Sequence, residues 1–126
     1  MSHGRQLESP EGQRLLDALR EVCGGLPEVE EVVDGFGHRT FKVRGKSFVI
    51  AGMGEDGLAI SVKSDPTTQA ELIRLGPYYR TPYIGQHGWV SLGDPLSHDW
   101  SAVTELIVDG YRLAAPRRLA RMVPPE

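Results

Sequence analysis

The residues best suited to chemistry in this sequence are basic side chains grouped with one tryptophan. They fall on predicted strands, where successive side chains alternate between the two faces of a sheet. Cations that contact phosphates, beside an aromatic ring that stacks on bases, are what a nucleic-acid surface requires. A solvated sheet face has the same composition, and the residues alone favour that simpler interpretation. The candidate DNA-binding residues are Arg39, Lys42, Arg44, Lys46, Lys63 and Trp89.

A second candidate surface is the segment 78–89, which is rich in tyrosine, glycine and proline. Aromatic side chains line many ligand pockets and anchor many protein interfaces. The alternative is that these rings pack the segment onto the sheet and that its histidine is exposed to water. The candidate pocket residues are Tyr78, Tyr79, Tyr83, His87 and Trp89.

No pattern in the sequence indicates an enzyme or a metal site. The four histidines lack the paired spacings of zinc ligands, and no G-x-S-x-G motif is present. Gly52 to Gly57 match G-x-G-x-x-G, but another strand follows instead of the helix that a dinucleotide site needs. We therefore interpret this stretch as a hairpin turn and expect no catalytic residue, no metal and no cofactor.

Length and composition limit the remaining classes. A chain of 126 residues with 40% hydrophobic and 25% charged residues is typical of one soluble domain. The formal net charge of -3 is not that of a general nucleic-acid binder, so such a function requires a local basic patch. The sequence has no membrane-length apolar run and no apolar signal core at its start, and a single Cys23 fits a reducing compartment. We expect a cytoplasmic protein without a membrane partner.

Hydrophobic periodicity predicts a helix at the start of the chain, followed by several strands. The helix begins at Ser9-Pro10, ends at Gly24-Gly25, and places Cys23 on its apolar stripe. Residues 28–36 form a short acidic strand near a sheet edge, where charge discourages mispairing. Glycine-bearing turns then separate three further strands. The apolar face of these strands is expected to consist of Phe41, Val43, Phe48, Ile50, Leu58, Ile60 and Val62.

The second half of the chain is expected to hold two helices and one strand. Asp65 caps a helix with Pro66 at its first position, residues 78–88 form an ordered loop, and residues 89–92 form a strand. A long helix runs from near Ser97 to Pro116, and a short basic turn with Arg117, Arg118 and Arg121 follows it. The inner faces of the two helices are expected to be Leu72, Ile73 and Leu75, and Trp100, Val103, Ile107, Gly110 and Ala114. Gly110 in mid-helix indicates a close approach to the sheet or a slight kink.

This pattern predicts an α+β fold with a single domain over residues 9–122 and a loose segment over residues 1–8. Its centre is an antiparallel β-meander of four to five strands, accompanied by an N-terminal, a middle and a long C-terminal helix. The exposed first strand offers an edge for pairing two copies, so the chain is expected to be a monomer or a weak dimer.

Several motifs resemble the MmcQ/YjbR family of small bacterial proteins. They are residues 41–46 (FKVRGK), 61–66 (SVKSDP), 82–90 (PYIGQHGWV), 99–100 (DW) and 110–119 (GYRLAAPRRL). The resemblance implies a secretion-chaperone-like fold, in which helices pack on one side of a curved antiparallel sheet. It also implies DNA binding through a double wing of hairpins, without enzymatic residues. One wing tip, Arg44-Gly45-Lys46, is basic, whereas the other, at residues 54–57 (GEDG), is acidic and departs from a symmetrical grip.

We therefore expect a non-enzymatic DNA-binding protein whose binding is weak, salt-sensitive and poorly sequence-specific, because phosphate contacts read no sequence. The alternative is a module that binds a small molecule or a protein through the segment 78–89 and the adjacent sheet face.

Overall fold

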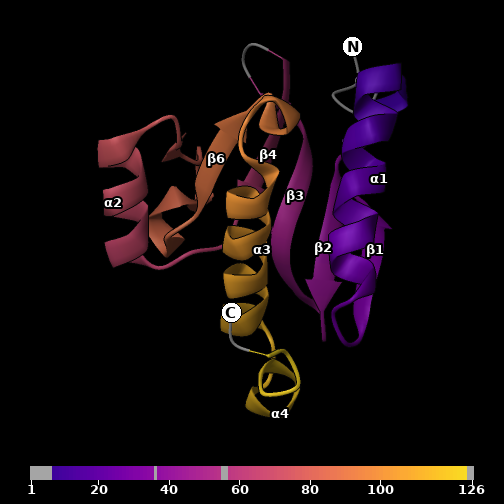
Figure 1. Cartoon of the computed structure of the whole chain (residues 1–126), viewed down its shortest axis with the longest axis vertical. Coiled ribbons are helices and arrows are strands. Elements are labelled where there is room, and N and C mark those ends of the chain that lie inside the picture. Colours follow the sequence, from indigo (N-terminus) through magenta and orange to yellow (C-terminus); the bar gives the residue numbers. More distant parts are fainter. Residues whose placement is uncertain (1–6, 36, 55–56, 125–126) are drawn as a thin grey trace.

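A six-stranded antiparallel sheet forms the centre of the structure, and two long helices lie across one of its faces (Figure 1). The computed structural model describes residues 7–35, 37–54 and 57–124. The strands follow the order β1-β2-β3-β4-β6-β5 across the sheet. Their bounds are β1 Val29–Val33, β2 Arg39–Val43, β3 Lys46–Gly54, β4 Gly57–Val62, β5 Tyr79–Arg80 and β6 Val90–Gly93.

Among the described residues, the helices comprise three longer elements and several short ones. They are α1 Pro10–Gly24, α2 Pro66–Leu75, α3 Trp100–Ala114, α4 Arg117–Ala120 and the 3-10 turns η2 Ile84–His87 and η3 Pro95–Ser97. Helices α1 and α3 cover the same face of the sheet, and α2 lies beside β6 (Figure 1). The predicted α+β class with an N-terminal, a middle and a C-terminal helix is confirmed, with six strands instead of four to five.

Helix α1 begins and packs as its sequence predicts. The Ser9 hydroxyl accepts a hydrogen bond from the Gly12 amide at 3.1 Å, which satisfies one of the free N–H groups of the first turn. Cys23 lies in the core, where burial raises the pKa of its thiol to about 12, so the thiol stays protonated at neutral pH. The predicted loose segment 1–8 needs correction at Leu7, whose side chain is buried and whose carbonyl accepts from Gln13 at 2.9 Å. Residues 1–6 lie outside the described part of the chain.

A β-bulge shifts the predicted alternation of β3. The register between β2 and β3 changes between Phe41 and Lys42, so that Phe48 and Val49 are both fully buried. Beyond the bulge, Ile50 pairs with Thr40 and Ser61 and therefore lies on the face away from α1 and α3. The prediction that Ile50 belongs to the core face is wrong, because one extra residue reverses the parity of the strand.

Helix α2 is less buried than expected. Gln69 is its only residue classed as buried, whereas Ile73 and Leu75, predicted on the inner face, are exposed to 39% and 64%. Leu72 does pack against the core. The segment predicted as a loop also contains the short edge strand β5 and the turn η2.

Helix α3 packs closely on the sheet through Gly110. A Cβ at this position would lie 2.7 Å from the Lys63 carbonyl oxygen, so the predicted close approach is confirmed. At the next position of the helix, the fully buried Tyr111 meets Phe48 edge to face at 5.5 Å between ring centroids. The Tyr111 hydroxyl donates to the Pro27 carbonyl at 2.8 Å, which ties α3 to the segment before β1.

Candidate nucleic-acid interface

The strand register brings three separate segments to one end of the sheet. Phe41, Val49, Val62, Val90 and Arg80 form a row of paired residues that crosses five strands. Beyond this row lie the β2–β3 turn, the exit of β4 at residue 63, and the connection 81–89 between β5 and β6. We call this the hairpin end of the molecule. Helix α4 lies at the same end (Figure 1).

The β2–β3 connection is a two-residue hairpin turn. Arg44 and Gly45 have φ angles of 50° and 81°, and positive values at both central positions define a type I′ turn. Glycine accepts this conformation without cost, whereas arginine rarely adopts it. The sequence therefore correctly located a basic hairpin tip, and Arg44 is held there at the turn itself. The residues of the second predicted tip, Glu55 and Asp56, lie outside the described residues.

Glu28 occupies the centre of the basic groups at the hairpin end. Its carboxylate accepts from Arg44 Nε at 2.7 Å and from Arg118 Nη2 at 3.3 Å, so it joins the hairpin tip to α4. These hydrogen bonds, led by the one from Arg44, lower the pKa of the Glu28 carboxyl below its usual value. Glu28 itself has a positive φ of 57°. Two of the arginines at this end therefore share one acid, which offsets one of their two charges.

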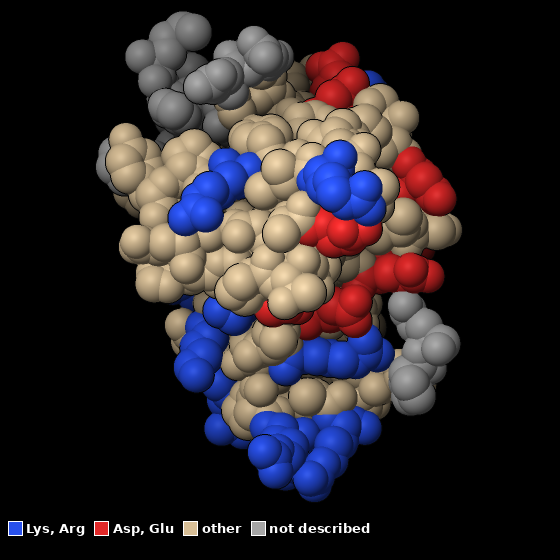
Figure 2. Space-filling model, turned by 90° about the vertical axis from the view of Figure 1, so that its left-hand side faces the viewer, with Lys and Arg blue, Asp and Glu red and all other residues tan. Residues whose placement is uncertain are grey.

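Other cations at the hairpin end have no carboxylate partner among the described residues. Lys46, Arg117 and Arg121 are exposed, and Lys63 is half-buried. Lys42 lies on the sheet face away from the core, but Glu30 is directly opposite it on β1, so it adds less free charge. Figure 2 shows Lys and Arg gathered at the lower end of the molecule, where Figure 1 places α4. Four unpaired cations thus share one end of a chain that is acidic overall.

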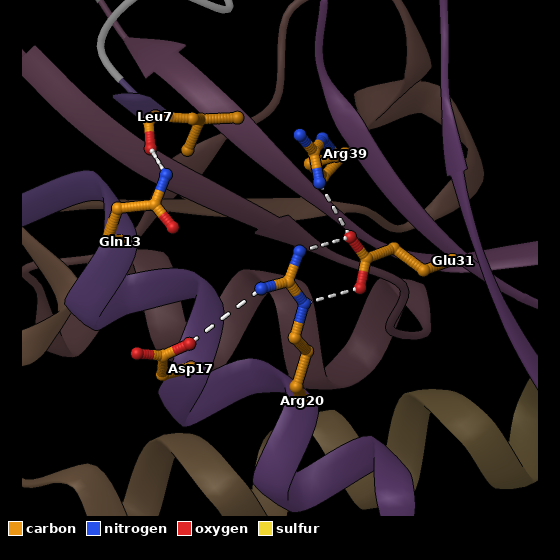
Figure 3. A network of polar contacts seen from close by, with 6 residues as sticks. All are labelled: Leu7, Gln13, Asp17, Arg20, Glu31 and Arg39. Carbon is orange, nitrogen blue, oxygen red and sulfur yellow. Dashed lines mark hydrogen bonds and ion pairs between the residues drawn. The ribbon is translucent and has the colours of Figure 1, made fainter. Parts of the chain in front are cut away.

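Arg39 is not part of this group. It lies on the same face of β2 as Phe41, and its Nη1 donates to Glu31 Oε2 at 2.8 Å. Glu31 also accepts two hydrogen bonds of 2.8 Å from Arg20 of α1 (Figure 3). The Arg20 bonds, and then the Arg39 bond, lower the pKa of the Glu31 carboxyl. Arg39 therefore helps to fasten β1 and β2 to α1 and is already neutralised.

The predicted aromatic residues separate into an inner and an outer group. Trp89 is only 6% exposed, and Tyr78 is half-buried against the core, where burial raises the pKa of its hydroxyl. Trp89 is therefore too buried to stack on a base. Tyr79, Tyr83 and His87 are exposed, and Tyr83 reaches 95% exposure. These five residues consequently do not line one common pocket.

A buried polar network holds the connection 81–89 in place. Gln69 of α2 donates to the carbonyls of Gly85 at 2.7 Å and Trp89 at 2.9 Å, and it is itself only 7% exposed. The hydroxyls of Thr81, Ser91 and Ser61 form a chain with distances of 2.9 and 2.8 Å. Satisfied buried networks of this kind fix one conformation. Sequence analysis missed Gln69, because a single glutamine on a helix gives no local signal of burial.

Two further features lie outside this interface. A cavity of about 100 Å³ between α1, the start of β4 and η3 is lined by Glu11, Arg14, Leu15, Leu58, Asp94, Pro95 and Leu96, at the end of the sheet away from the hairpin end. Within the described ranges, no group of three or more His, Cys, Asp or Glu residues is placed to hold a metal ion. None of the helices described there is long and apolar enough to cross a membrane.

The fold and the surface together define an α+β protein with a one-sided helical layer and a basic hairpin end. The family model YjbR matches residues 24–113, and the chain therefore belongs to the YjbR family. Among solved structures, it is similar to the crystal structure of Deinococcus radiodurans protein DR2400, a DUF419-domain protein. That similarity has a TM-score of 0.66 with 28% identity and covers 78% of this chain and 76% of the other. No curated protein matches this chain.

Proposed function

We propose that this protein binds DNA through the phosphate backbone at its hairpin end. The observation that carries the proposal is the group of four cations, Lys46, Lys63, Arg117 and Arg121, that have no carboxylate partner among the described residues. They come from β3, the exit of β4 and the C-terminal turn around α4, which share one end of the sheet. A phosphate backbone supplies the complementary charge, and such contacts position a protein without reading sequence.

The surface differs in two ways from the one that the sequence predicts. Arg39 and Trp89 leave the candidate set, because the first is bound to Glu31 and the second is buried. Arg117 and Arg121 join it, because α4 lies at the hairpin end (Figure 1). The signal for these two was the basic run after Pro116, which sequence analysis identified only as a basic turn. Lys42 and Arg44 remain at the margin, each with an acidic neighbour.

The number of free cations predicts how strongly binding responds to salt. Four phosphate contacts on duplex DNA give a slope of about −3.6 in a plot of log K against log salt concentration. Between 50 and 200 mM salt, affinity would then fall by about 150-fold. Binding is consequently expected to be weak and poorly specific under near-physiological conditions.

Fluorescence anisotropy of a labelled generic duplex, titrated at several salt concentrations, tests the proposal. The double variant Lys46→Gln with Lys63→Gln is expected to make the slope of log K against log salt concentration shallower, by the amount that about two phosphate contacts contribute. Arg14→Gln is the matched control, since Arg14 is exposed and lies beside the cavity at the other end of the sheet. Absence of saturable binding at low salt, or an unchanged slope in the double variant, would overturn the proposal.

The alternative, a small-molecule or protein module on the segment 78–89, has less support. Two of its five predicted residues, Tyr78 and Trp89, point into the protein, as their burial shows. The three exposed residues of this set, Tyr79, Tyr83 and His87, nevertheless lie close to the hairpin end.

A further inference from the structure

Tyr83 is the most exposed large aromatic side chain in the described part of the chain, and its backbone is strained. Its φ and ψ angles are 67° and −58°, and the Ile84 amide donates to the Pro82 carbonyl at 2.8 Å across it. These values define a γ-turn of the rare positive-φ form, with Tyr83 at its apex. Strained residues of this kind persist only where the surroundings enforce them, and they concentrate at functional sites. The residue is 95% exposed, so side-chain packing does not explain the strain.

The turn is rigid because both of its flanks are fixed. On one side, Thr81 is 7% exposed, bonds through its hydroxyl to Ser91 at 2.9 Å, and accepts from the Gly85 amide at 2.9 Å. On the other side, Gln69 holds the carbonyls of Gly85 and Trp89. A ring displayed on a fixed support loses little conformational entropy when it binds a partner.

Two cations belong to the segments that pack against the connection around Tyr83. A Cβ on Gly88 would overlap the Ser64 carbonyl oxygen, so the end of the turn packs against the residue that follows Lys63. Arg80, which is exposed and has no ion-pair partner among the described residues, lies over Gly85. Tyr83 thus belongs to a connection that packs against the Arg80 side chain at Gly85 and against Ser64, the neighbour of Lys63, at Gly88.

We propose that Tyr83 stacks on an unpaired base of a single-stranded nucleic acid whose phosphates contact the hairpin end. This inference rests on the proposed DNA-binding function and narrows it to the single-stranded form. A tyrosine at the apex of a rigid turn reaches the flat face of a base only where the base is not stacked within a duplex. Single-strand binding combines two interactions: cations attract the phosphate backbone, and an exposed aromatic ring stacks on a base.

The sheet is wide enough for a short strand. From β2 to β5 there are four strand spacings, or about 19 Å at about 4.8 Å each. At about 3.4 Å per nucleotide, the spacing of a stacked strand, this span corresponds to five or six nucleotides, and a more extended strand would place fewer. A labelled 15-nucleotide oligo(dT) is therefore a suitable probe, with a blunt duplex of the same length as its comparison.

The test compares Tyr83→Ala and Tyr83→Phe on both probes at low salt. Loss of one stacked base predicts that Tyr83→Ala binds oligo(dT) about 5- to 150-fold more weakly. Tyr83→Phe keeps the ring, so its affinity for oligo(dT) is expected to stay within twofold of the parent protein. Affinity for the blunt duplex is expected to change less than twofold in both variants. Leu96→Ala removes an exposed apolar side chain beside the cavity at the other end and is the control for general surface effects.

The outcomes separate this inference from the proposed function. If the parent protein binds the duplex in a salt-dependent way but Tyr83→Ala retains full affinity for oligo(dT), the stacking role is wrong and the phosphate surface stands. An equal loss on both probes would also overturn stacking on an unpaired base. If the parent protein binds neither probe at low salt, both proposals fail. Circular dichroism of Tyr83→Ala, expected to match the parent, confirms that a lower affinity does not come from unfolding.

Discussion

Replacing Glu28 with glutamine is expected to strengthen nucleic-acid binding. The Glu28 carboxylate accepts from Arg44 Nε at 2.7 Å and from Arg118 Nη2 at 3.3 Å, so it would compete with a phosphate group for both guanidinium groups. Glutamine has the same shape and can adopt the same backbone conformation, but it carries no charge. The variant therefore releases two guanidinium groups at the hairpin end while it keeps the fold.

The magnitude follows from the number of contacts. Two added phosphate contacts are expected to steepen the slope of log K against log salt concentration from about −3.6 to about −5.4. At 0.1 M salt, release of counterions contributes about 8-fold per contact, so affinity for a duplex would rise by about 60-fold. Stability is expected to change little, because exposed ion pairs contribute little to the free energy of unfolding.

Anisotropy titrations of the Glu28→Gln variant at four salt concentrations measure both the affinity and the slope. Glu71→Gln is the matched control, because it frees an exposed arginine, Arg74, from a 2.6 Å ion pair on α2 and away from the four free cations. The control is expected to leave the slope unchanged. If Glu28→Gln gives the slope and affinity of the parent protein, Arg44 and Arg118 do not contact phosphate, and the assigned interface is wrong at its centre.

Two further predictions concern the support of this surface. Gly110→Ala is expected to destabilise the protein by about 1–3 kcal/mol, because the new Cβ would lie 2.7 Å from the Lys63 carbonyl oxygen and must displace α3 or β4. Gly24→Ala is the control, since a Cβ at Gly24 would have no atom within 4 Å. Equal stability of both variants in urea unfolding would contradict the close packing at Gly110. Glu31→Gln removes a carboxylate whose pKa lies below its usual 4.5 in the folded state, so the group stabilises the protein above about pH 4.5 and loses this contribution as the pH falls through the folded pKa. The melting temperature of Glu31→Gln is thus expected to be lower than that of the parent at pH 7. It is expected to approach that of the parent as the pH falls below 4.5 and through the folded pKa of Glu31, and a difference that does not depend on pH would refute the assigned ion pairs.

The sequence predicted the elements well because their signals are local. Ser9 and Asp65 cap helices by bonds to amides three residues away, and Arg44-Gly45 forms a turn whose chemistry lies in two residues. The errors arise where an element that is distant in the sequence determines which face a residue lies on or whether it is buried. The bulge at Phe48 depends on the pairing of β2 with β3, and it moved Ile50 to the other face. Trp89 is buried because the connection 81–89 is held against α2 by Gln69, which no local pattern shows.

Arg39 illustrates a different reason for error, because the alternation along β2 already placed it on the face of Phe41. Its charge suggested the solvated face. Glu31 on β1, which also accepts from Arg20 on α1, provides a carboxylate partner that lets Arg39 lie at the edge of the covered face. The same pairing explains how an acidic chain presents a basic end. Glu28 and Glu31 each bind two arginines, those of Glu31 from α1 and β2 and those of Glu28 from the hairpin tip and α4. These arginines already have acidic partners, and among the described residues most cations without a carboxylate partner lie at the hairpin end, where the proposed phosphate contacts would form.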